Sequence, residues 1–190
     1  MPNVMRYRGG DCQPQPFKTN PNYPIQEGDL LFMDPTDGTA RPATALKNQG
    51  DKATNQDYFQ QYFAGVALGR SGLQPGEWTP TRTTDIGYVL VATGGDFEFD
   101  CPTQQFKPGD LVGVFADAKG CQSQQVDTAA SASLAIGTAV PGVQSLQNPA
   151  SRIVVRIKST IATGGVQNQV AGAGSGQEEN QPPAVGTSST

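Results

Sequence analysis

The chain has 190 residues, with 13 basic and 17 acidic side chains, a formal net charge of −4 and no histidine. The lack of histidine removes the commonest general base and metal ligand, and with them every Ser-His or Cys-His catalytic arrangement. No basic cluster suggests a nucleic-acid partner, no apolar run approaches the ~20 residues of a membrane span, and the N-terminus lacks a signal-peptide core, so we expect synthesis in a cytoplasm.

The composition predicts an all-β protein with a lean core. Gly 23 and Pro 15 stand beside only 36% hydrophobic residues, which favours short strands joined by many turns. Three cysteines, Cys12, Cys101 and Cys121, show no CxxC spacing. We therefore expect reduced thiols and no disulfide framework, with Cys101 a small buried residue.

Residues 1–24 are predicted to form an extended N-terminal arm, because their prolines prevent a helix. Arg6, Tyr7 and Arg8 alternate as in a short strand, with both arginines on one side. An arm of this kind can add a strand to the sheet edge of a neighbour, so these three residues are candidate partner-binding residues. The alternative is that the arm covers an edge of its own β module.

Two related β modules are predicted over residues 25–100 and 101–164. In each, a Gly-Asp turn opens an apolar strand, a glycine-bearing apolar strand follows, and a β-branched strand closes the unit. These motifs lie at Gly28, Gly65 and Val89 in the first module, and at Gly109, Gly137 and Val154 in the second. We expect the modules to superpose as small barrels or to pack as one sandwich.

The longer loop of the first module contains the one helix that we expect, opened by Thr54-x-x-Asp57. It carries Tyr58 and Tyr62. Together with Trp78, these aromatic residues are candidates for a platform that binds a sugar or a protein partner. The alternative is that they close the loop over the module.

The segment Asp96-Phe97-Glu98-Phe99-Asp100 alternates strictly, so three carboxylates share one face of a strand. Same-face neighbours lie about 6.8 Å apart, a spacing compatible with a glycosidase acid pair or with calcium ligands. The alternation rule favours a third interpretation, a solvated outer face with Phe97 and Phe99 in the core.

Residues 165–190 are rich in Gly, Pro and Ser and carry few apolar side chains. Such a segment cannot bury enough surface to offset its conformational entropy. We therefore expect a flexible C-terminal tail that contributes little to the fold.

Residues 4 to about 165 resemble the capsid decoration proteins of tailed bacteriophages, also called cement proteins. The resemblance is carried by strand motifs in a fixed order and includes no catalytic signature. The motifs are Arg6-Tyr7-Arg8-Gly9, then "EGDLLFMDPTDGTARPA", "FAGVALGRS", "VATGGDFEFDC", "FKPGDLVGV", "LAIGTAV" and "VVRIKSTIATGG". Members of such families are small β proteins that sit on the outside of the head lattice, commonly as trimers, and clamp neighbouring coat subunits.

The resemblance implies a structural virion protein on the outer capsid surface, made in the cytoplasm of a bacterial host. Its expected partners are the major capsid protein and further copies of itself, with a trimer favoured, and no enzyme activity, cofactor or metal is expected. Two alternatives remain open. One is a head-fibre or receptor- or carbohydrate-binding virion module, and the other is a histidine-free glycosidase that uses Asp96, Glu98 or Asp100.

Overall fold

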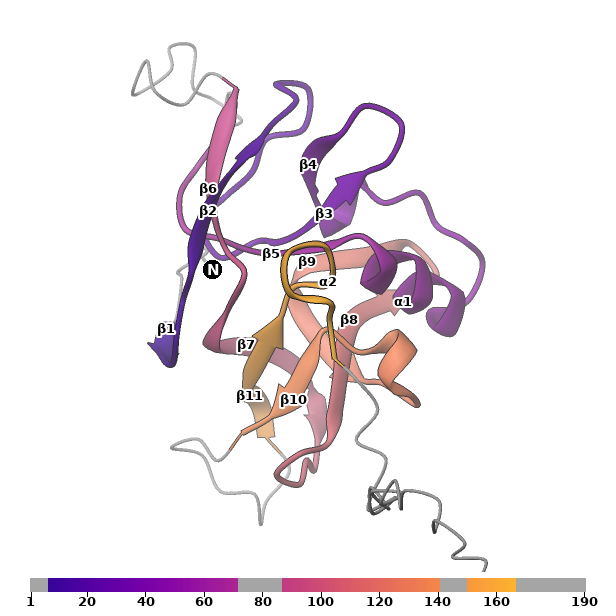
Figure 1. The fold of residues 1–190 in the computed structure, drawn as a ribbon. Coiled ribbons are helices and arrows are strands. Elements are labelled where there is room, and N and C mark those ends of the chain that lie inside the picture. The colour runs from indigo at the N-terminus through magenta and orange to yellow at the C-terminus, as the bar shows by residue number, and fades with distance from the viewer. Residues whose placement is uncertain (1–6, 72–86, 141–149, 167–190) are drawn as a thin grey trace, which may run out of the picture.

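The computed structural model describes residues 7–71, 87–140 and 150–166, and the mostly β class is confirmed there (Figure 1). Trp78 and nearly all of the predicted tail lie outside these ranges. The described elements are β1 (Tyr7–Gly9), β2 (Pro14–Lys18), β3 (Leu30–Asp34), β4 (Thr39–Pro42), η1 (Ala43–Ala45), α1 (Lys52–Gln61), β5 (Phe63–Ala67), β6 (Tyr88–Ala92), β7 (Gly94–Gln104), β8 (Leu111–Asp117), β9 (Gly120–Thr128), η3 (Ala132–Leu134), β10 (Gly137–Ala139), β11 (Ala150–Lys158) and α2 (Thr160–Thr163).

One sheet closes into a five-stranded barrel. Its strand order is β7-β11-β10-β8-β9, and β9 returns to β7 through a parallel pairing of Asp100 with Gln125. The short strand β1 adds to the free side of β7, opposite Phe97 and Asp96. Closure leaves few open edges, which limits unwanted strand addition.

The other sheet has the order β2-β6-β5-β3-β4. Like the barrel, this sheet brings its two outer strands together: Thr19, directly after β2, forms a parallel bridge to Ala40 in β4. In each unit the last strand along the chain pairs with the first: β6 pairs with β2, and β11 pairs with β7. The first strand also contacts the third, since β7 pairs with β9 and the residue after β2 bridges to β4.

The two sheets share strand order and register. Leu31 pairs with Gly65 between β3 and β5, and Val112 pairs with Gly137 between β8 and β10. This is the arrangement that the predicted repeat requires, with Gly65 equivalent to Gly137. Helical segments also recur in the same place, with α1 before β5 and η3 before β10.

The equivalent glycines are required for the same close approach of two strands. A Cβ atom at Gly65 would lie 2.0 Å from the carbonyl oxygen of Ala92, and one at Gly137 would lie 2.3 Å from the carbonyl oxygen of Arg156. Both distances are far inside van der Waals contact. The glycines thus let the central strand of each sheet meet the strand beside it.

The Gly-Asp turns also repeat in detail. Gly28 and Gly109 adopt φ values of 87° and 88°, a conformation that favours glycine. The carboxylates of Asp29 and Asp110 each accept a hydrogen bond from the backbone N–H three residues earlier, at 2.8 and 2.7 Å. The same short motif therefore begins β3 and β8.

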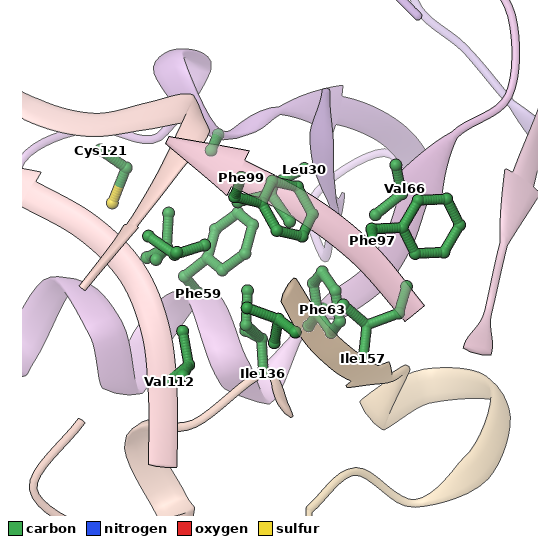
Figure 2. Packing of buried hydrophobic residues seen from close by; sticks show 14 of the residues in the cluster. Leu30, Phe59, Phe63, Val66, Phe97, Phe99, Val112, Cys121, Ile136 and Ile157 are labelled. Carbon is green, nitrogen blue, oxygen red and sulfur yellow. The ribbon is translucent and has the colours of Figure 1, made fainter. Parts of the chain in front are cut away.

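The main hydrophobic core joins the two sheets and α1 (Figure 2). Phe59 of α1 packs there with residues from both units, including Leu30 and Val66 of the first sheet and Phe97 and Ile157 of the second. A smaller cluster fills the interior of the first sheet. The outer face of the first sheet is thus partly covered by the second unit.

Two details differ from the sequence prediction. The boundary between the sheets lies between β6 and β7, at Thr93, because β7 pairs with β11 and so places residues 94–100 in the second sheet. The helix is present, but it begins before Thr54. Asp51 is its N-cap, and the Asp51 carboxylate accepts a hydrogen bond from the backbone N–H of Thr54 at 2.8 Å.

Candidate interaction surface

The strand β7 carries the predicted carboxylates on its outer side. Phe97 and Phe99 are 1% and 4% exposed and belong to the main core, while Asp96, Glu98 and Asp100 point away from it. The interpretation as an outer face over a phenylalanine core is therefore confirmed for this strand.

Each of these carboxylates is held by an arginine of a neighbouring strand. Arg156 of β11 donates to Asp96 through Nε at 2.8 Å and Nη2 at 3.0 Å, and Arg152 donates from Nε to Asp100 at 3.2 Å. On the other side, Arg8 of β1 donates from Nε to Glu98 at 3.1 Å. The ion pairs occupy carboxylate oxygens that an acid pair or a calcium ion would need.

The described part of the N-terminal arm pairs with its own chain. The strand β1 adds to β7, and β2 pairs with β6 over its whole length. The ring of Tyr7 packs on Phe97 with 5.4 Å between centroids, and its hydroxyl donates to the carbonyl of Gly10. Arg8 binds Glu98 of its own chain, which agrees with the alternative that the arm covers an edge of its own module, and its role in partner binding stays a prediction. Arg6 lies outside the described residues.

The predicted aromatic platform is brought together only in part. Tyr58 of α1 and Tyr62, the C-cap of that helix, have 5.1 Å between ring centroids, and both pack partly against the main core. Phe63 is fully buried in that core. Trp78 lies outside the described residues.

The cysteines are free thiols, as expected. Burial raises the pKa of Cys101 to about 11 and that of Cys121 to about 12, with smaller contributions from nearby aspartates. Cys12 is half-buried, and burial also raises its pKa. Since the thiolate is the nucleophile, these thiols are poorly suited to reaction.

One buried carboxylate lies where the two sheets meet. The amide of Gln124 in β9 donates to Asp29 at 3.1 Å and to the backbone carbonyl of Glu27 at 3.1 Å. Burial raises the pKa of Asp29 to about 6, against the opposing effect of its hydrogen bonds. Asp29 therefore ties the first Gly-Asp turn to the second sheet.

An exposed apolar surface on β2 and β6 was not predicted from the sequence. Tyr88 and Leu90 are 60% and 50% exposed, and the cross-strand partner of Leu90 is the exposed Pro16. We call the outer side of this strand pair the ribbon face; it is formed by Pro14, Pro16, Lys18, Tyr88 and Leu90. The signal was present in Tyr88-Val89-Leu90-Val91, where apolar residues occupy both faces of one strand.

Comparison of the chain with family models, with curated proteins and with solved structures found no match. Across residues 7–71, 87–140 and 150–166, no helix is long and apolar enough to cross a bilayer. In those ranges, no three His, Cys, Asp or Glu side chains gather as metal ligands do.

Proposed function

We propose that this protein is a structural component of a tailed-phage virion, which binds the outer surface of the head and joins neighbouring major capsid subunits. The proposal rests on where the motifs that resemble decoration proteins lie in the fold. They contribute residues to β3 to β8, β10 and β11, which form most of both sheets. The resemblance therefore concerns the framework that would carry a binding surface.

The side chains of the fold suit a passive binder. The conspicuous carboxylates of β7 are paired with arginines, and the buried thiols have raised pKa values. What the described surface offers instead is the ribbon face, which is apolar. Apolar side chains in exposed clusters are a common means of protein contact.

Repetition would supply the affinity. Many weak contacts on a lattice add up when linked, since linked sites raise avidity by roughly 10²–10⁴ over a single contact. We propose that the protein acts as a homo-oligomer bound to the major capsid protein, outside the shell, where each added contact bridges two coat subunits.

The test is binding to heads that lack the protein. Purified protein is mixed with undecorated heads and sedimented, and bound copies per head are counted as the input rises. We expect saturable binding to sites spread over the whole shell in an electron-microscopy map, with heads that survive a higher temperature. Heat-unfolded protein is the control. Binding at a single vertex would indicate a fibre component, and failure to bind would refute the proposal.

A further inference from the structure

The N-terminal part of the described chain contacts both units. Its strand β1 pairs with β7 of the second sheet, whereas β2, a few residues later, pairs with β6 of the first sheet. Among the described strands, β1 pairs with β7 alone and lies at the end of its sheet. The strand thus precedes the first unit in sequence but belongs to the second unit by pairing.

Three contacts hold β1 on the edge of β7. Backbone pairing sets Tyr7 opposite Phe97, and the two rings pack with 5.4 Å between their centroids. Arg8 donates from Nε to Glu98 at 3.1 Å. The side chains of β1 nevertheless face solvent, since Tyr7 is 43% exposed and the Arg8 side chain is 48% exposed. The contact is therefore specific, but within the described chain it involves only three residues of β1.

The part of the β7 edge that carries β1 has no other described strand beside it. The strand β11 pairs with the opposite side of β7, and β9 reaches β7 only at Asp100. Phe97 and Glu98 precede that point and lie where β1 covers the edge. An open strand edge is a template for another strand. This edge therefore needs a strand with the side chains of β1, whichever copy of the chain supplies it.

The connection between β1 and β2 is strained at one residue. Gln13 has a φ of 37° and is the single non-glycine residue with positive φ among those that the structure describes. This region of φ is unfavourable for an L-residue other than glycine. Gly10 has a φ of 85°, so the backbone changes direction twice within this short connection.

Rotation about the φ bond of Gln13 would redirect β1 and leave β2 in place. The carbonyl of Gln13 accepts hydrogen bonds from the N–H and the hydroxyl of Thr93, at 3.4 and 2.9 Å. The φ bond joins N to Cα, so a return to negative φ moves the residues before Gln13 while its carbonyl stays on Thr93. Short connections under strain of this kind favour exchange of the element that they hold.

We infer that two copies of this chain exchange β1, so that Tyr7–Gly9 of each copy pairs with β7 of the other. The contacts within one chain identify the occupant, because Tyr7 on Phe97 and Arg8 with Glu98 can form in the same way between copies. Exchange needs no new surface, and it relieves the strain at Gln13 in both copies. The inference does not rest on the proposed binding to heads.

The first test changes the strain and leaves the contacts of β1 intact. After refolding from urea, sedimentation equilibrium of the wild type should show dimers of twice the chain mass of 19.9 kDa. Gln13→Gly removes the strain and should weaken dimerisation about tenfold or more. Gln13→Thr should strengthen dimerisation, because β-branched residues tolerate positive φ least. The matched control is Gln15→Thr, an exposed position of β2 without positive φ, which should dimerise as the wild type does.

The second test identifies β1 as the exchanged element. Arg8→Glu and Glu98→Arg each set like charges together, both in a closed chain and in a dimer of one variant. A mixed dimer restores both ion pairs, because each altered residue meets the altered residue of the other copy. Native mass spectrometry after joint refolding should therefore find mixed dimers above their statistical share. The control carries both substitutions in one chain and should dimerise as the wild type does, although Arg152 lies 3.9 Å from Glu98.

A wild type that remains monomeric after refolding at every concentration would overturn the inference. So would a dimer that is insensitive to both Gln13 substitutions, or mixed dimers that form only at their statistical share. A protein that exchanges β1 but never binds heads would refute the proposed function and leave this inference standing.

Discussion

Replacing Gly65 by alanine should be among the most destabilising single changes in this chain. The new Cβ would lie 2.0 Å from the carbonyl oxygen of Ala92 and 2.9 Å from Cγ1 of Val91, and the backbone φ of Gly65 is 140°. An L-residue forced to positive φ costs about 1–2 kcal/mol, and pushing β5 from β6 costs about 1–3 kcal/mol more. The expected loss is about 2–5 kcal/mol, a large part of a total of about 5–15 kcal/mol.

Two further glycines separate the causes. Gly38 has φ of 65° with nothing within 4 Å of its built Cβ, so Gly38→Ala should lose only the strain. Gly137→Ala should lose mainly the cost of contact with Arg156, 2.3 Å away. The measurement is urea unfolding followed by far-UV circular dichroism. If Gly65→Ala loses no more than Gly38→Ala, the close approach of the strands is not what requires glycine.

Three other changes test the local chemistry. The folded-state pKa of Asp29 is raised to about 6, so the unfolding free energy should fall as pH rises from about 4 to about 6. The expected fall is about 3 kcal/mol relative to the Asp29→Asn variant. Parallel pH profiles of the two proteins in urea titrations would contradict this. Asp51→Ala removes the acceptor for the N–H of Thr54 and should cost about 1 kcal/mol, whereas Asp51→Asn should retain most of the stability. Cys101 and Cys121 should resist iodoacetamide at pH 8 in the folded protein and react once it is unfolded in urea, measured by mass spectrometry; rapid labelling of the folded chain would show that they are accessible.

The sequence predicted what local patterns control. Alternation placed Phe97 and Phe99 inside β7, and the recurring Gly-Asp turns indicated the shared plan of the two sheets. The helix was also predicted, but its start was placed too late. The Asp51 carboxylate accepts a hydrogen bond from the backbone N–H of Thr54, so the helix begins after Asp51. This hydrogen bond is visible only in the folded backbone.

The sequence could not predict which strands are neighbours. Prolines suggested that residues 14–18 were an arm, yet they form β2. Pro14 and Pro16 occupy positions whose backbone faces the free edge of the strand, where no N–H group is needed for pairing. Residues 96–100 seemed to end the first module, but their partner is β11, more than fifty residues further on. Such pairings depend on long-range packing and leave no local pattern. For the same reason the ribbon face could not be predicted, because it forms only where β2 pairs with β6.

A single residue, Thr93, separates β6 from β7 and so connects the two units. It is buried, its hydroxyl donates to the carbonyl of Gln13, and its own carbonyl accepts from the N–H of Ser159. The chain therefore has no hinge at this point, and the distance between the outer surfaces of the two units is set by the backbone. Two contact surfaces carried on these two units would be held at one fixed spacing. For a protein proposed to bridge coat subunits, that fixed spacing would restrict binding to pairs of sites at one distance from each other.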